Sequence, residues 1–141
     1  MHDPQESLGF HCNITLKAFL GALERKLKGT GISPAQYVAL AHLIALGPMS
    51  QSDLVDRLSI TRATGVRLID RMERDGWVRR SPDPKDGRVK LVVPTEQASQ
   101  IWKIISRSGR AVMAQAYRKV DPVEIEMVKR VLERVRENLV G

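Results

Sequence analysis

The stretch from Thr61 to Arg74 contains the side chains with the clearest chemistry in this 141-residue chain. At about 100° per residue, a helix over this stretch has a polar side and an apolar side. The polar side carries Thr64, Arg67, Arg71 and Arg74, and the apolar side carries Gly65, Leu68, Ile69 and Met72, with Val66 at its margin. Arginine binds guanine edges or phosphates with two hydrogen bonds, and a DNA major groove admits a helix. The pattern predicts a helix that docks by one face and offers the other to nucleic acid.

The residues of this polar face differ in the contact that we expect of them. Arg67 is the best candidate for a base edge, with Thr64 and Arg62 beside it. Arg62 is equally suited to a phosphate or to plain solvation. Arg71 is expected to hold a phosphate rather than to read a base.

Two hydroxyl residues, Ser50 and Thr61, stand at predicted helix starts. Backbone N–H groups at a helix start favour anions, so both hydroxyls could donate to phosphates. Simple helix capping is the alternative for each, and it explains either residue taken alone.

A turn-rich stretch, SPDPKDGRVK, runs from Ser81 to Lys90. Its two prolines and its Asp-Gly pair predict a turn, and the Val-rich segments WVRRS and RVKLVV beside it predict two strands. A β-hairpin directly after two helices is expected.

The charges at this hairpin tip suit turn formation and DNA contact. Asp83 and Asp86 can accept hydrogen bonds from nearby backbone N–H groups and can fix the guanidinium of Arg88. Arg88 is suited to the negative potential of a narrow minor groove. Lys85 and Lys90 are further candidates for DNA contact, and the two carboxylates are not expected to bind a metal.

The overall charge favours a polyanionic partner. The formal net charge is +7, and the segment 57–90 holds ten basic and five acidic residues, so most of the excess lies in this unit. A merely solvated basic surface is the alternative. Aromatic residues make up only 4% of the chain, which argues against platforms for stacking single-stranded bases.

The elements that must position these residues are mainly helical. Apolar spacing and capping residues predict helices over 8–28, 34–46, 51–60, 62–74 and 95–119, and a last helix after Asp121-Pro122. The expected fold class is therefore mainly α with a small β-hairpin wing, that is, a winged helix-turn-helix with a helical dimerisation arm.

The expected domain organisation is a DNA-binding lobe over residues 32–94, with residues 1–31 and 95–141 forming the arm. The last helix carries a heptad-like apolar seam. Its members are Ile125, Val128, Leu132, Val135 and Leu139, and Leu16 and Leu20 extend the expected dimer surface on the first helix. Intramolecular packing is the alternative, but intersubunit packing is favoured in a chain this short.

The segment LVDRLSITRATGVRLIDRMERDGWVRRSPDPKDGRVKLVVPTEQA resembles the core of the MarR (multiple antibiotic resistance regulator) family. The likeness extends over almost the whole chain. The matching positions are Thr64, Arg67, Asp70 and Arg71 in the recognition helix, and Asp83, Asp86 and Arg88 in the wing. The resemblance implies that Asp70 orients an arginine, for which Arg88 is the candidate.

The resemblance also implies partners. It implies a homodimer on a near-palindromic double-stranded DNA site, usually a repressor that a small phenolic or other lipophilic ligand releases. An effector cleft is expected between the lobe and the arm, although no residue pattern marks it. Two departures make the operator sequence non-transferable: Gly65 stands where the family usually has Val, and Val66 where it has Thr or Ser. A glycine inside a helix costs about 1 kcal/mol relative to alanine.

Other chemistries find little support. Cys12 lies where relatives that sense oxidation keep a reactive cysteine, but an incidental or buried thiol is the simpler expectation. One cysteine and three dispersed histidines predict no metal site and no cofactor. Enzyme motifs are not found, and a basic module for RNA or protein without an effector is the remaining alternative. With no signal peptide or membrane span in the sequence, a cytoplasmic protein is expected.

Overall fold

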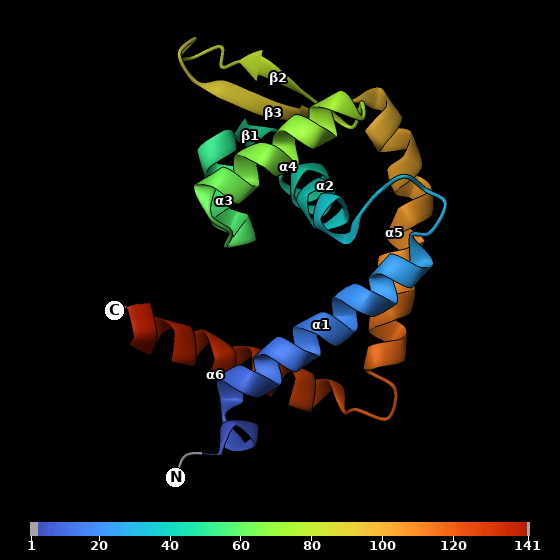
Figure 1. Ribbon diagram of the computed structural model, residues 1–141, viewed down its shortest axis with the longest axis vertical. Helices are drawn as coiled ribbons and strands as arrows, with labels where there is room; N and C mark the ends of the chain where they lie inside the picture. The colour runs from blue at the N-terminus through green and yellow to red at the C-terminus, as the bar shows by residue number, and fades with distance from the viewer. Residues whose placement is uncertain (1–2, 141) are drawn as a thin grey trace.

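The computed structural model describes residues 3–140 and places three helices and a small sheet above three further helices (Figure 1). The upper group, called the lobe here, contains α2 (Pro34–Leu46), β1 (Met49–Ser50), α3 (Gln51–Leu58), α4 (Arg62–Arg74), β2 (Val78–Pro82) and β3 (Lys90–Pro94). The lower group, called the arm, contains α1 (Leu8–Lys26), α5 (Glu96–Ala116) and α6 (Pro122–Val140), with a short 3₁₀ helix at Pro4–Glu6. The mainly α fold with a hairpin wing is confirmed.

Capping residues fix the starts of the helices, as the sequence predicts. Ser50, Thr61 and Thr95 each accept a hydrogen bond from a backbone N–H in the first turn of α3, α4 and α5. A complete capping box lies at Ser33 and Gln36, at the start of α2.

The sheet has three antiparallel strands in the order β1-β3-β2. The hairpin of β2 and β3 agrees with the sequence, and Val78 pairs with Pro94 at its base. The strand β1 was not predicted. It has two residues, which is too short for any alternation to be visible, and it forms because Met49 and Ser50 lie opposite Val92 and Leu91.

The hydrophobic core joins both groups of helices. In the lobe it is built from fully buried side chains of every helix and of β3, and the arm adds residues of α1 and α5. The largest of these side chains include Leu40, Leu43, Leu54, Ile69, Met72, Val92 and Ile105. This core holds α4 against the lobe by one face, which leaves the opposite face of α4 in solvent.

The last helix is the least buried element of the arm. In Figure 1 it crosses α1 in this view and runs to the C-terminal end, and none of its described residues is buried. Ile125, Leu132 and Val135 are half-buried, whereas Val128 and Leu139 are 53% and 81% exposed. No helix in the described part of the chain is both long and apolar enough to cross a membrane.

Candidate nucleic-acid interface

The exposed face of α4 carries the predicted set of polar side chains. Gly65, Ile69 and Met72 are buried, in agreement with the apolar side of the helical wheel. The candidates for DNA contact lie in solvent: Thr61, Arg62, Thr64, Arg67 and Arg71. An outward Thr/Arg face on a helix supported by a packed core is the geometry that a major groove requires.

Gly65 allows α4 to approach α3 closely. A Cβ atom at this position would overlap Cγ2 of Val55 on α3 and would lie 3.2 Å from the Val55 Cβ. The departure from the family pattern therefore has a packing reason. The cost of a helical glycine is offset by the close approach of the two helices.

The two capping hydroxyls differ in what remains for DNA. Thr61 Oγ1 accepts from the Thr64 N–H at 3.2 Å and donates to Thr64 Oγ1 at 2.8 Å, so its proton is already used. Ser50 Oγ accepts from the Asp53 N–H at 3.1 Å, and this bond leaves its proton for a phosphate.

Arg80 joins the wing to the two helices of the helix-turn-helix. Its guanidinium donates to Asp70 at 2.6 Å and Glu73 at 2.8 Å on α4, and to Gln51 Oε1 at 3.0 Å on α3. Its backbone N–H donates to Glu73 as well, at 3.1 Å. The side chain is only 21% exposed, so three hydrogen-bonding side chains converge on a partly desolvated cation.

The sequence-based assignment of Asp70 to Arg88 is therefore wrong. Asp70 pairs with Arg80, in the middle of β2, whereas Arg88 lies in the turn between β2 and β3. Sequence reasoning did not single out Arg80, although a signal exists. Val78 and Arg80 share a face of β2 because side chains alternate along a strand, and Val78 is buried.

The wing tip is shaped by its two aspartates, as predicted. Asp83 accepts from the Lys85 N–H at 2.8 Å, and Asp86 accepts from the Arg88 N–H at 3.1 Å. Asp86 also holds the Arg88 guanidinium at 3.2 Å. The Arg88 side chain is 92% exposed, so this ion pair contributes at most about 1 kcal/mol and leaves Arg88 free to bind DNA.

A hollow of about 440 Å³ separates the start of α3 from the wing. Basic side chains line it from the start of α4 and from the wing. Its lining is Ser50, Gln51, Ser52, Arg62, Arg80, Arg88, Val89 and Lys90. The charge and the N-terminus of α3 both favour an anion such as a backbone phosphate. Lys85 lies exposed at the tip, outside this lining.

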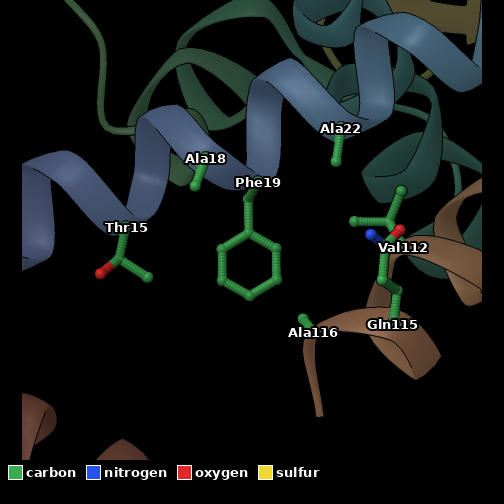
Figure 2. A pocket seen from close by; sticks show the side chains of 7 residues that line it. All are labelled: Thr15, Ala18, Phe19, Ala22, Val112, Gln115 and Ala116. Carbon is green, nitrogen blue, oxygen red and sulfur yellow. The ribbon is translucent and has the colours of Figure 1, made fainter. Parts of the chain in front are cut away.

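A second hollow, of about 180 Å³, lies between two helices of the arm. Figure 2 shows the Phe19 ring of α1 directed toward α5, with small residues on either side. The lining is Thr15, Ala18, Phe19, Ala22, Val112, Gln115 and Ala116. The hollow is almost wholly apolar and belongs to the arm alone, whereas the resemblance implied a cleft between the arm and the lobe.

Other candidate chemistry is sparse in the described residues. Cys12 is exposed on α1, so of the two expectations for it, a buried or an incidental thiol, the buried one does not hold. Residues 3–140 contain no cluster of three His, Cys, Asp or Glu side chains that could hold a metal ion.

Comparison with known proteins agrees with this geometry. The sequence model of the MarR family matches residues 30–89, which run from the turn after α1 to the wing. The HTH-type transcriptional regulator YdgJ of Bacillus subtilis is 30% identical over 110 residues, which are 78% of this chain and 67% of that protein. The chain belongs to the MarR family. It is thus a DNA-binding transcriptional regulator and not an enzyme.

Solved structures of MarR regulators share the fold over nearly the whole chain. A MarR family regulator from Listeria monocytogenes, in complex with a 26mer DNA, has a TM-score of 0.85 at 25% identity, covering 95% of this chain and 89% of that one. CouR from Rhodococcus jostii, bound to p-coumaroyl-CoA, has a TM-score of 0.84 at 20% identity, covering 96% of this chain and 95% of that one. The second likeness concerns the fold alone.

Proposed function

We propose that this MarR regulator is a homodimeric, cytoplasmic repressor that binds a near-palindromic operator and leaves it when a small lipophilic or phenolic ligand binds. The observation that carries the DNA-binding part is the exposed Thr/Arg face of α4, flanked by the basic hollow under the wing. In this proposal α4 enters the major groove, Arg67 and Thr64 contact bases, and Arg62 and Arg71 hold the strands beside them.

The wing and the start of α3 supply the phosphate contacts. Arg88 reaches the adjacent minor groove, with Lys85 and Lys90 on the flanking backbone. The Ser50 hydroxyl and the backbone N–H groups of α3 receive a phosphate in the hollow. Asp83 and Asp86 keep the tip in the shape that these contacts need, and Asp70 acts through Arg80.

The arm supplies the dimer contact in this proposal. Several large apolar side chains of α1 and α6 are exposed, and exposed apolar patches mark interaction surfaces. The exposed apolar side chains include Leu8, Phe10, Ile14 and Leu16 on α1, and Met127, Val128, Val131 and Leu139 on α6. A second copy of the chain would cover them, with the half-buried Leu20, Ile125, Leu132 and Val135 beneath.

The hollow between α1 and α5 is the best candidate for the effector. Its apolar lining and the Phe19 ring suit a lipophilic or aromatic molecule, and Thr15 and Gln115 offer polar groups that could fix its orientation. The hollow lies in the arm, so a ligand that moves α1 and α5 apart would change the position of the lobe on the arm. That coupling would explain release from DNA.

A gel-shift assay tests the proposal. The probe is the DNA upstream of the protein's own gene, with bulk DNA and bulk RNA as competitors, and a panel of simple phenols and hydroxybenzoic acids is added afterwards. We expect a specific complex to form and at least one ligand to lower the affinity for DNA. The Ala22→Leu variant should reduce this effect of the ligand, because its larger side chain fills the hollow. Equal competition by bulk RNA would contradict the DNA-regulator part, and release that ignores Ala22→Leu would contradict the assigned pocket.

A further inference from the structure

The first turn of α2 lies where the lobe meets the arm (Figure 1). Gln36, in this turn, is 2% exposed, and both its amide oxygen and its amide nitrogen form hydrogen bonds. Its Oε1 accepts from the Ser33 N–H at 3.2 Å, and its Nε2 donates to Asp75 Oδ2 at 3.1 Å. Asp75 is the C-cap of α4, so the start of α2 is bound to the end of the recognition helix.

The next residue, Tyr37, faces the arm. The centroid of its ring lies 5.0 Å from the centroid of the Trp102 ring of α5, with an angle of 35° between the ring planes. Its hydroxyl end lies over Gly109 of α5, where a Cβ atom would overlap the hydroxyl oxygen and would lie 2.7 Å from Tyr37 Cζ. Burial raises the pKa of the Tyr37 phenol, against the opposing effects of the Arg110 charge and the Gly109 backbone.

Gly109 is not needed for the backbone conformation of α5. It lies inside a 21-residue helix, where glycine costs about 1 kcal/mol relative to alanine. The space that it leaves is filled by Tyr37. By contrast, a Cβ atom at Gly21 of α1 would meet only the end of the Arg25 side chain, at 3.7 Å. The absent side chain at Gly109 thus has a specific use, as the seat of Tyr37.

We infer that Tyr37 and Gly109 are positioning residues for DNA binding, because their contact fixes the orientation of the lobe on the arm. The inference rests on the proposed dimeric binding to a near-palindromic site. Two recognition helices must lie about 34–36 Å apart to enter successive major grooves on one side of DNA. Tyr37 contacts Gly109 of the arm, and its neighbour Gln36 is hydrogen-bonded to Asp75 at the end of α4. A shift of Tyr37 at Gly109 would therefore displace the recognition helix in both subunits.

The test compares full and half operators. The probe is a duplex selected in vitro with the wild-type protein, together with a version whose second half-site is scrambled and versions with one base pair added to or removed from the spacer. For Gly109→Ala we expect the affinity for the full duplex to fall about tenfold, the size of one lost base contact, and the preferred spacing to change. Affinity for the half-site duplex should stay within about twofold of wild type, because each lobe is intact.

The matched control is Gly21→Ala, which adds the same methyl group to an arm helix where there is room. It should keep the wild-type affinity and spacing preference. The second variant, Tyr37→Leu, adds no atoms to α5 and removes the ring that sets the orientation. We expect it to bind the three spacings with more nearly equal affinity than wild type does.

The outcomes are separable. Equal losses on full and half duplexes with an unchanged spacing preference would show that the contact only supports folding, and would overturn the inference. If Gly109→Ala does not fold by circular dichroism, Tyr37→Leu decides by its spacing preference alone. If the wild-type protein selects no duplex, the proposed function itself is wrong and the inference falls with it.

Discussion

At the scale of single residues, the exposed arginines of α4 differ in what the fold does with them. Arg67 lies in the middle of the exposed face and Arg71 one turn further along the helix, toward its C-terminal end. In a helix-turn-helix the N-terminal part of the recognition helix contacts the base edges, so Arg67 is placed closer to the bases than Arg71, which is suited to a phosphate. The two residues should therefore differ in their effect on specificity.

Replacing Arg67 by alanine tests this difference. We expect the variant to lose about 1–3 kcal/mol of binding free energy on the selected duplex and much less on a scrambled one, because a base contact discriminates between sequences. Fluorescence anisotropy on the two duplexes measures it. Arg118→Ala, which removes another exposed charge beyond the end of α5, is the control for lost charge. A uniform loss on both duplexes would mean that Arg67 holds a phosphate.

The residue scale also marks a limit of prediction from sequence. The roles of Asp83 and Asp86 at the wing tip follow from local chain geometry, and the structure confirms their backbone bonds. The choice of partner for Asp70 depends on which part of the hairpin returns to α4. Tertiary packing decides this, so the sequence suggested Arg88 where the structure has Arg80.

At the scale of elements, one side chain connects the wing to both helices of the helix-turn-helix. Arg80 binds Asp70, Glu73 and Gln51, so it joins β2 to both α3 and α4. The two carboxylates are themselves partly exposed, which weakens each ion pair through solvent screening. The hydrogen bonds to Gln51 and Glu73 fix the orientation of the Arg80 side chain, and with it that of β2, relative to α3 and α4.

Replacing Arg80 by methionine should weaken the contact of the wing with α3 and α4. We expect the free energy of unfolding to fall by about 1–2 kcal/mol, because two carboxylates lose a charged hydrogen-bond donor in a partly desolvated place. DNA affinity should fall too, as the wing loses its orientation toward α4. Urea unfolding and gel shifts measure the two effects.

The neighbouring residue supplies the control for this prediction. Arg79 is exposed on the opposite face of β2, so Arg79→Met removes the same charge from the same strand. It should leave the free energy of unfolding within about 0.5 kcal/mol of wild type. If both variants unfold at the same urea concentration, Arg80 does not stabilise the contact of the wing with α3 and α4.

Most helices could be predicted because their signals are local. Ser33 with Pro34, Thr61 and Thr95 start helices by side-chain hydrogen bonds within one turn. The close packing at Gly65 could not be predicted in this way. The sequence shows a costly glycine, but only the proximity of Val55 on another helix explains it.

At the scale of the whole molecule, the uneven burial of the chain indicates where a second copy would bind. The lobe has a closed core, whereas the last helix has no buried residue in its described part. The apolar seam of α6 is only half covered by its own chain, and exposed apolar residues of α1 add to the same kind of surface. Dimerisation would bury this surface and double the basic footprint offered to DNA.

Replacing Val128 by aspartate tests this arrangement. The side chain is 53% exposed in a single chain, so a carboxylate there should cost a monomer little. In a dimer the same carboxylate would lose its water, and we expect the dimer dissociation constant to rise at least about 100-fold. Light scattering during size-exclusion chromatography at several concentrations measures the mass. Arg130→Asp places the same group on the other side of α6, about 200° away on the helical wheel, and should stay dimeric. A wild-type protein that is monomeric at every concentration, or a Val128→Asp dimer as tight as wild type, would mean that α6 is not the interface. The expected half-site spacing of about one DNA turn would then lose its structural basis.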